Sequence, residues 1–172
     1  MKYEVIDNFL PEEYFAILEK NIAIPNTKMP WFCEPSVTGN ADEKKYSNLF
    51  YMTHCFYMNN LPTSTLFDQL MPLIDEVEAG CLLRVKANFY PNTETLYEHP
   101  MHIDYSFLHS GAILSLNTCD GYTKLKDGTK IDSVANRVLL FDSSEEHCST
   151  TTTNVHARIN ININYIQEQY NE

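Results

Sequence analysis

Two histidines and one aspartate are the residues of this chain whose types and spacing best fit a metal site. His102 and Asp104 are separated by one residue in EHPMHIDYS, so on an extended segment their side chains share a face. A third ligand must come from a distant segment, and His147 is available in FDSSEEHCST, at the start of a late strand. Two histidines and one carboxylate on one side of a metal ion form the facial triad of non-haem Fe(II) sites. Such a triad leaves adjacent coordination positions open for a chelating cosubstrate and for O₂.

The other histidines compete for the ligand role. His99 could pair with His102, but the carboxylate of Asp104 completes a triad better. His156 lies two residues before Arg158, on the same face of the last strand, and either enters the same pocket or lies at the surface. His54 and His109 are the remaining rivals. Because a lone H-x-D occurs by chance in many proteins, the assignment depends on the whole ordered set of residues.

The last predicted strand has one polar and one apolar face. In ARINININYI, residues 157–166, the apolar and polar residues alternate perfectly, which is typical of a β-strand. The usual arrangement places the isoleucines in the core and the polar face in solvent. The polar face carries Arg158, Asn160, Asn162 and Asn164, and the apolar face carries Ile159, Ile161, Ile163 and Tyr165.

In chain order, His102, Asp104, His147 and Arg158 follow the pattern H-x-D, then H, then a basic residue about ten positions later. On this pattern the chain resembles the 2-oxoglutarate/Fe(II)-dependent dioxygenases, near their short prolyl-4-hydroxylase-like branch. The flanking segments RVKANFYP, LNTCDGYTKLKDGTKI and NRVLLFDSSEEHCST are similar too. The resemblance covers about 80–166, half of the chain, with a weaker match in IDNFLPEEY near the N-terminus.

The resemblance implies a cosubstrate pocket inside a double-stranded β-helix. The polar face of the last strand would then look inward, and its isoleucines outward toward helices. Arg158 would bind the distal carboxylate of 2-oxoglutarate, because a planar guanidinium matches a carboxylate bidentately. Asn160 stands where family members often have a hydroxyl residue, and an amide can donate the same hydrogen bond. Asn88 and Tyr90, which share a face of the strand at 81–90, are assigned to the same pocket by the resemblance.

The reaction implied by the resemblance is hydroxylation of an unactivated C–H bond, with Fe(II), O₂ and the decarboxylation of 2-oxoglutarate to succinate. Asp104 favours hydroxylation, because relatives that halogenate carbon replace this carboxylate with a small residue. The expected substrate is a prolyl or other residue of a peptide or protein, and the acidic composition would suit a basic segment. A free amino acid or small metabolite is the alternative. Tyr105, Trp31 and Tyr51 are the candidates for substrate contact.

The elements that must position these residues suggest one domain, a mainly β protein with N-terminal helices. We expect a double-stranded β-helix (jelly-roll, cupin-like) barrel over 81–166, with 1–80 as helical support and a possible lid within 22–60. Residues 22–60 show no clear periodicity of apolar and polar residues, and they either close over the substrate or cover a sheet. The expected helices are 10–22 and 64–80, after an opening strand at 2–9. The later strands are expected at 81–90, 101–105, 110–117, 122–126, 129–134, 137–142, 146–150 and 156–165.

Local signals sharpen these expectations. Pro72 should kink the second helix, and Gly80 should cap its C-terminus. Asp120-Gly121 and Asp127-Gly128 are hairpin-turn signals. Asn136 precedes an apolar run, and asparagine tolerates the left-handed backbone conformation.

Composition excludes several classes of protein. The 172 residues are 44% hydrophobic and 12% aromatic, as in an ordinary globular domain. A net charge of −11 argues against a nucleic-acid groove, and no apolar run approaches the length of a membrane span. The start of the chain does not read as a signal peptide, and the five cysteines contain no C-x-x-C. We therefore expect a cytoplasmic protein with no nucleic-acid or membrane partner, and the oligomeric state stays open.

Two other classes of function fit part of the pattern. One is a non-catalytic metal-binding module of cupin type, but a purely structural site needs no carboxylate clamp at Arg158. The other is a zinc hydrolase, which two histidines and a carboxylate would suit. The sequence contains no matching helical H-E-x-x-H.

Overall fold

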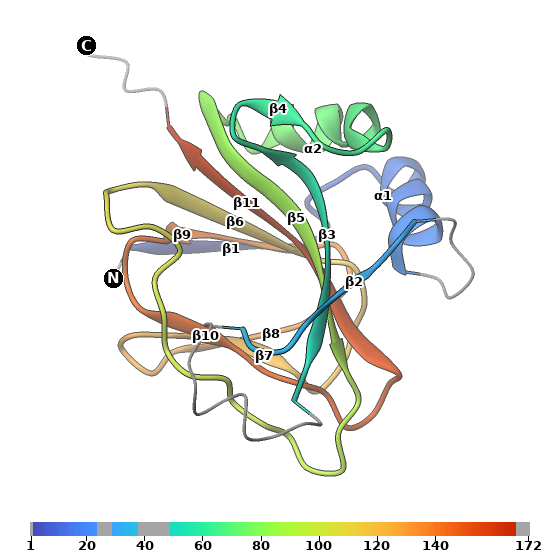
Figure 1. Ribbon diagram of the computed structural model, residues 1–172, viewed down its shortest axis with the longest axis vertical. Helices are drawn as coiled ribbons and strands as arrows, with labels where there is room; N and C mark the ends of the chain where they lie inside the picture. The colour runs from blue at the N-terminus through green and yellow to red at the C-terminus, as the bar shows by residue number, and fades with distance from the viewer. Residues whose placement is uncertain (1, 24–28, 38–48, 168–172) are drawn as a thin grey trace.

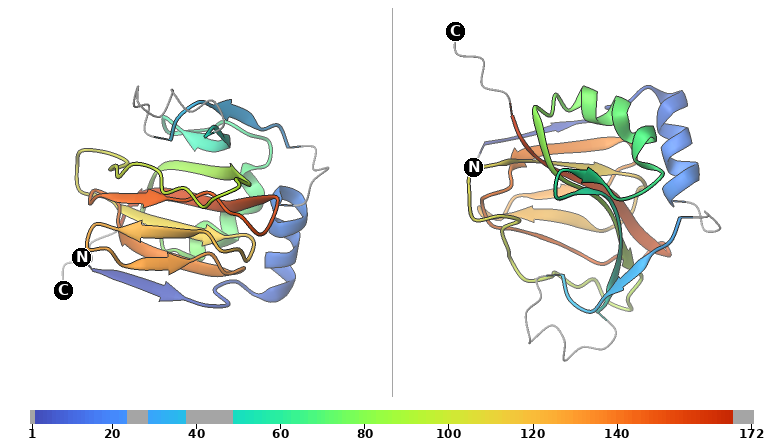
Figure 2. Two further views of the ribbon diagram at one scale, coloured as in Figure 1. Left: turned by 90° about the horizontal axis from the view of Figure 1, so that it is seen from below. Right: turned by 45° about the horizontal axis from the view of Figure 1, so that its top comes forward.

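Two antiparallel sheets face each other and enclose the interior of a barrel (Figures 1 and 2). The structure is a computed structural model that describes residues 2–23, 29–37 and 49–167. Across the larger sheet, called the major sheet, lie β1 (Tyr3–Ile6), β9 (Arg137–Asp142), β6 (Ser110–Ser115), β11 (Ala157–Ile166), β5 (Cys81–Pro91), β3 (Tyr51–Met58) and β2 (Phe32–Glu34), with β4 (Leu61–Pro62) paired to β3. The smaller sheet, called the minor sheet, consists of β10 (His147–Ser149), β7 (Tyr122–Leu125) and β8 (Lys130–Asp132).

Two helical segments cover the outer face of the major sheet (Figure 1). The first is α1 (Glu12–Leu18), extended by the π-helical turn η1 (Glu19–Ala23), and the second is the 3₁₀ turn η3 (Phe67–Leu70) followed by α2 (Met71–Glu76). Their apolar side chains and those of the sheet form one core, whose fully buried members include Leu18, Leu73, Val85, Ile161 and Ile163. Burying each such side chain contributes about 1.5–3 kcal/mol, so this core holds the helices on the sheet.

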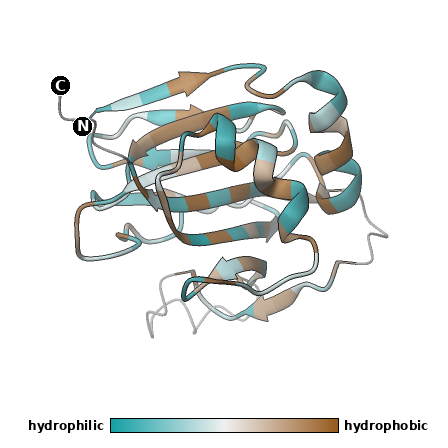
Figure 3. Cartoon of the chain, turned by 90° about the horizontal axis from the view of Figure 1, so that it is seen from above, coloured by the Kyte–Doolittle hydropathy of each residue, from teal (hydrophilic) through white to brown (hydrophobic). Residues whose placement is uncertain are grey.

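Strand β11 separates that apolar core from a polar barrel interior. It lies between β5 and β6, and its isoleucines belong to the core beneath the helices. Figure 3 shows the alternation of hydrophilic and hydrophobic residues along the strands. The expectation that the polar face of β11 looks inward is confirmed. The inward residues of β11 lie beside inward residues of β5 in four pairs, the polar rungs: Arg158–Tyr90, Asn160–Asn88, Asn162–Lys86 and Asn164–Arg84.

Another part of the barrel interior is apolar. A second buried cluster joins β6 and β9 of the major sheet to β7 and β8 of the minor sheet. It consists of Ile113, Leu125, Ile131, Leu139 and Phe141. The polar rungs therefore lie to one side of a packed interior.

The second predicted helix, 64–80, is shorter and is divided in two. Pro72 does not kink it but lies in the first turn of α2, where its missing N–H costs no hydrogen bond. The helix ends at Glu76, and Glu78, not Gly80, takes the left-handed conformation, with φ of 56°. Propensity alone did not place this end, because a non-glycine residue occupies the left-handed position.

Of the two aspartate–glycine pairs, one forms the expected hairpin. Gly128, with φ of 89°, lies in the turn between the paired strands β7 and β8. Asp120-Gly121 makes no hairpin, since β6 and β7 lie in different sheets. Gly121 instead permits a close approach, because a Cβ there would lie 2.7 Å from Cδ of Arg158. Asn136 is left-handed as expected, with φ of 59°, and its side-chain amide bonds both backbone groups of Leu10.

Two further segments differ from expectation. Residues 101–105 form no strand, and within them only His102 makes an isolated bridge, to His147. The neighbouring Pro100 has no N–H with which to continue a ladder. Within 22–60, the strands β2 and β3 extend the major sheet, so 1–80 contributes strands as well as helices. Residues 24–28 and 38–48 lie outside the described residues, and the lid stays a prediction.

None of the helices in the described ranges has both the length and the apolar character needed to cross a membrane.

Candidate metal centre

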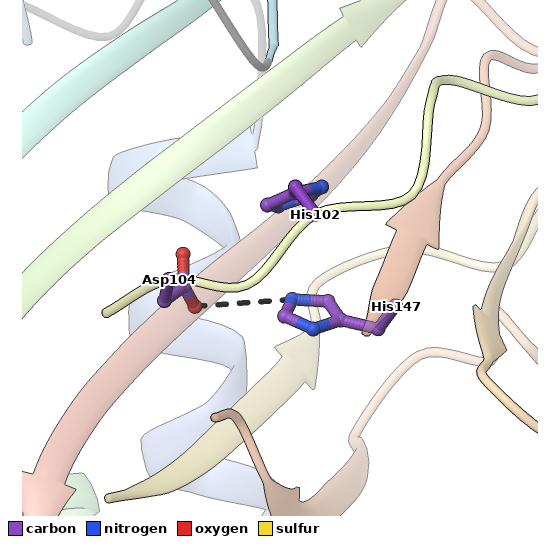
Figure 4. A group of neighbouring side chains, drawn as sticks. All are labelled: His102, Asp104 and His147. Carbon is purple, nitrogen blue, oxygen red and sulfur yellow. Dashed lines mark ion pairs between the residues drawn. The ribbon is translucent and has the colours of Figure 1, made fainter. Parts of the chain in front are cut away.

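His102, Asp104 and His147 meet at one point in the barrel, as the sequence predicts. His102 and Asp104 lie on the 92–109 connection between β5 and β6, and His147 begins β10 of the minor sheet. Each histidine donates its backbone N–H to the other's carbonyl oxygen at 2.9 Å, which holds the connection against β10. One ligand atom from each residue lies within 4.8 Å of the others (Figure 4). This arrangement suits a single metal ion bound on one side by three protein ligands.

Both imidazoles are prepared to bind a metal at neutral pH. Nδ1 of His147 lies 3.0 Å from the carbonyl oxygen of Glu145, and Nδ1 of His102 lies 3.3 Å from that of Pro100. A proton on each Nδ1 would leave the Nε2 lone pairs free for the metal. Burial, with the neighbouring His147 adding to it, lowers the pKa of His102 to about 4. Burial also lowers the pKa of His147, so the metal need not displace a proton from either ring.

The Asp104 carboxylate is fixed by a network of donors. Nη2 of Arg84 donates to Oδ1 at 2.7 Å, while Oγ of Ser143 and Nδ2 of Asn164 each donate to Oδ2 at 2.8 Å. Burial acts to raise the pKa of Asp104, but the charge of Arg84, together with the charge of Lys86 and the hydrogen bond from Asn164, outweighs it and holds the pKa well below its usual range. The carboxylate is therefore ionised and oriented before any metal arrives.

Arg158 is completely buried, and only some of its guanidinium N–H groups have hydrogen-bond partners. Its Nη2 donates to Oγ1 of Thr123 at 2.7 Å, and the guanidinium carbon lies 5.5 Å from the ring centre of Tyr90. Nε and Nη1 have no hydrogen-bond partner among the described residues. A buried donor left without a hydrogen bond costs about 1–3 kcal/mol of stability. An anionic ligand that accepts hydrogen bonds from Nε and Nη1 would remove this cost. A planar guanidinium binds a carboxylate through two parallel hydrogen bonds.

The other predicted cosubstrate residues surround the same small cavity. Nδ2 of Asn88 donates to Oδ1 of Asn160 at 2.9 Å on the neighbouring polar rung. A cavity of about 20 Å³ is lined by the triad together with Asn88, Tyr90 and Asn160. A cavity of about 960 Å³ elsewhere contains no triad residue, and we assign the chemistry to the small polar one because the ligands lie there.

None of the three predicted substrate residues lines this cavity. Tyr51 is buried and stacks on Tyr90, with ring centres 5.6 Å apart. Tyr105 lies beside the metal ligands, and its ring centre is 5.4 Å from the guanidinium carbon of Arg84. Trp31 packs on Phe89, on the helix-covered face of the sheet, and its assignment to substrate contact stays a prediction.

The rival histidines do not belong to this group of ligands. Both ring nitrogens of His54 are bonded, to the carbonyl of Pro30 and to Oγ of Ser64. The ring of His99 is near Tyr90, that of His109 bonds the carbonyl of Phe107, and His156 is exposed. Within the described residues, the triad is the group of side chains close enough to share a metal ion.

Sequence reasoning gave no role to four polar residues that face this site. Arg84 and Lys86 of β5 and Asn162 and Asn164 of β11 lie on the polar rungs next to Asp104. Burial, with the charge of Arg84 adding to it, lowers the pKa of Lys86 to about 8, so its ammonium is still protonated at neutral pH. The alternation in RVKANFY already places Arg84 and Lys86 on the face of Asn88 and Tyr90, which was the available signal.

Comparisons with known proteins agree with this architecture at the level of the fold. No protein-family model matches the sequence, and a search of curated proteins found no match. Among solved structures, a prolyl-4-hydroxylase from Pseudomonas putida is similar at 15% identity, with 96% of this chain and 92% of that one covered and a TM-score of 0.63.

Two further solved structures are similar over 96% of this chain. A Trichoplax adhaerens prolyl hydroxylase, in complex with a hypoxia inducible factor oxygen degradation domain peptide fragment, has 16% identity, 83% of its own chain covered and a TM-score of 0.62. A 2OG-Fe(II) oxygenase family oxidoreductase from Burkholderia pseudomallei has 12% identity, 86% covered and a TM-score of 0.66. These likenesses confirm the predicted jelly-roll barrel buttressed by helices.

Proposed function

We propose that this protein is an Fe(II)- and 2-oxoglutarate-dependent dioxygenase that hydroxylates an unactivated C–H bond. One observation carries the proposal: the triad and the incompletely satisfied guanidinium of Arg158 serve the same polar side of the barrel interior. A metal alone would need the triad but not a buried arginine. A cosubstrate that chelates the metal at one end and carries a carboxylate at the other needs both. The fold shared with solved 2-oxoglutarate oxygenases supports this assignment.

Different residues would bind the metal and the cosubstrate. His102, Asp104 and His147 would hold Fe(II), with Arg84, Ser143 and Asn164 keeping the carboxylate in place. When bound, the iron supplies the O₂ chemistry that couples decarboxylation of 2-oxoglutarate to hydroxylation of the substrate.

Arg158, whose neighbours Tyr90 and Thr123 line the cavity, would bind the distal carboxylate of 2-oxoglutarate. Tyr90 stacks against its guanidinium, while Asn88 and Asn160 would contact the middle of the cosubstrate. The packed apolar residues on the other side of the interior limit access by water.

We propose a prolyl or other residue of a peptide or protein as the substrate. A residue of a peptide or protein is supported by the Trichoplax adhaerens structure, which contains a peptide. A free amino acid or small metabolite is the alternative. Tyr51, which stacks on Tyr90, and Tyr105, which follows Asp104 and contacts Arg84, are the candidates for substrate contact.

We also propose that residues 1–172 act as one cytoplasmic oxygenase domain without a nucleic-acid or membrane partner. The net charge of −11 and the five cysteines, all unpaired, support this setting.

The test is an anaerobic titration of metal-free protein with Fe(II) and then 2-oxoglutarate, followed by calorimetry and by the visible charge-transfer band of the chelate. Wild type should bind both in sequence. His147→Ala should lose the metal, and Arg158→Ala should keep the metal but bind 2-oxoglutarate at least tenfold more weakly. Arg137→Ala, which removes a half-buried arginine paired with Asp7, is the control. Iron binding that does not respond to 2-oxoglutarate in wild type would refute the proposal and favour a cupin-type metal module.

A further inference from the structure

Among the described residues, three cations lie on the polar rungs of the barrel interior, and two of them have an assignment. Arg84 is paired with Asp104 at 2.7 Å, and Arg158 is suited to the distal carboxylate of 2-oxoglutarate. Lys86 lies between them, on the rung it shares with Asn162. The ammonium of Lys86 makes no hydrogen bond or ion pair with any residue in the described part of the chain, and it lies 5.7 Å from the centre of the Tyr51 ring.

The position of Lys86 places it beside the metal centre rather than beside Arg158. Lys86 and the triad line the same cavity. The rung next to it holds Asp104 through Arg84 and Asn164, whereas the Arg158–Tyr90 rung is four residues away along β5. At about 3.3 Å per residue this separation is roughly 13 Å of strand. Lys86 therefore lies on a rung next to the one that holds Asp104, where it can meet a charged group that enters the cavity beside the metal ligands.

A second polar atom on the same rung is also without a partner. Oδ1 of Asn162 is buried and has no hydrogen bond among the described residues. Nδ2 of the same amide reaches Oδ2 of Asp104 at 3.4 Å. The rung thus presents one unpaired cation and one unpaired acceptor next to the metal ligands. A substrate carrying both a carboxylate and an N–H would satisfy both atoms.

The net charge of the barrel interior also favours an anionic group on the substrate. Fe(II) and the 2-oxoglutarate dianion cancel, and Asp104 offsets one of the three cations, so the filled site would keep a net positive charge. Glu34 on β2 also acts on Lys86, but its side chain is exposed to solvent. A charge retained in a low-dielectric interior is costly unless a counter-ion enters with the substrate.

We propose that the substrate carries a carboxylate that Lys86 binds next to the metal, with the amide of Asn162 accepting a hydrogen bond from an N–H of the same molecule. This inference rests on the proposed function and narrows its substrate class. A free amino acid meets the requirement with its α-carboxylate and ammonium group, and a peptide meets it with an acidic side chain or a free C-terminus.

The experiment measures binding to the protein loaded with Mn(II) and 2-oxoglutarate, which cannot turn over. The probes are the free L-amino acids, their carboxamides, and prolyl peptides with either a free or an amidated C-terminus. At least one carboxylate probe should bind wild type at least tenfold more tightly than its carboxamide, because a charge-assisted hydrogen bond is lost in the amide. Binding by free amino acids or only by free-terminus peptides identifies the source of the carboxylate.

Variants of Lys86 locate the interaction. Lys86→Met should abolish the preference for the carboxylate, Lys86→Arg should retain most of it, and Lys20→Met, at an exposed lysine, should change nothing. All three should bind Mn(II) and 2-oxoglutarate as wild type does.

Three outcomes would overturn the inference. The first is that every probe binds wild type and Lys86→Met with the same affinity. The second is that the carboxamides bind wild type as tightly as the acids do. The third is that Lys86→Met weakens the binding of 2-oxoglutarate instead. If wild type binds neither Mn(II) nor 2-oxoglutarate, the proposed function itself has failed, and this is visible before any probe is added.

Discussion

At the scale of single residues, the metal site is organised around one carboxylate. Asp104 accepts hydrogen bonds from Arg84, Ser143 and Asn164, which come from three different strands or their ends. A carboxylate held in this way loses little conformational freedom when it binds a metal. The residues around the ligands therefore contribute to metal affinity without touching the metal.

Ser143→Ala tests this contribution. Ser143 is completely buried and donates to Oδ2 of Asp104 at 2.8 Å. Removing its hydroxyl should weaken Fe(II) or Mn(II) binding by about tenfold, at the low end of the effect of residues that orient metal ligands. Anaerobic metal titration gives the affinity. Ser133→Ala, which removes an equally buried hydroxyl bonded to Ser115, should leave it unchanged. Equal affinities for the two variants would mean that Ser143 does not orient Asp104.

Sequence reasoning reached the residues whose chemistry is fixed by type and order. His102, Asp104 and His147 come together as expected, and Arg158 is inside the barrel. It did not reach Lys86 or Arg84, because their role depends on the register that places β5 beside β11. Nor could the sequence predict that Trp31 packs on Phe89 at the helix-covered face, because aromatic character does not say which face of a sheet a side chain covers.

At the scale of elements, the 92–109 connection is not regular structure, yet it carries two of the three predicted metal ligands. It is held to the minor sheet at two points, the His102–His147 bridge and the bridge from Glu98 to Thr150. The Glu98 carboxylate also accepts hydrogen bonds from Tyr122 and Lys124 of β7 and lies 3.2 Å from Nζ of Lys130 of β8. A local clamp on this connection substitutes for the ladder that a strand would have supplied.

Glu98→Gln should weaken that clamp in a pH-dependent manner. Hydrogen bonds from Lys124 and Tyr122 hold the pKa of Glu98 at about 2, below its ordinary value of 4.5. The unfolded chain therefore binds this proton at higher pH than the folded one. The clamp contributes its full stability above pH 4.5 and loses it as the pH falls toward 2.

At pH 7, Glu98→Gln should melt about 1–3 °C below wild type, because a partly exposed ion pair is weak. The gap should close between pH 4.5 and 2 in calorimetric scans. Lys126→Met, which breaks an exposed pair with Glu145 elsewhere, should not reproduce this profile. A gap of the same size at pH 2.5 and pH 7 would contradict the clamp.

Element boundaries were predictable where pattern and packing agree. The alternation in 157–166 specifies β11 because one face must cover the helices, and Asn136 tolerates its left-handed position. The 101–105 strand was wrong because alternation there serves metal ligands, not pairing with a neighbouring strand. The second helix was predicted too long because apolar residues continue at helical spacing past Glu76. In the structure the helix ends at Glu76, and Glu78 takes the left-handed conformation.

At the scale of the whole molecule, the major sheet is stabilised from outside by the helices and from inside by a second apolar cluster. The two sheets carry different parts of the proposed site. Arg158 belongs to the major sheet, His147 belongs to the minor sheet, and the connection with His102 and Asp104 lies between them. A metal ion bound by the triad would thus link the minor sheet to this connection, whose Asp104 is already bonded to Arg84 and Asn164 of the major sheet.

Hydrogen exchange can detect that link. The backbone N–H groups of His102 and His147 bond each other's carbonyl oxygens across the two segments, so their exchange reports separation of the connection from β10. A ligand at 100 times its dissociation constant stabilises the bound state by about 2.7 kcal/mol, which corresponds to exchange roughly a hundredfold slower. Mn(II) should slow these two amides by up to that factor, and His147→Ala should abolish the effect. Amides of β2, at an edge of the major sheet, should be unaffected where they exchange by local fraying. If Mn(II) binds and the His102 and His147 amides exchange at their metal-free rates, the metal does not join the two segments.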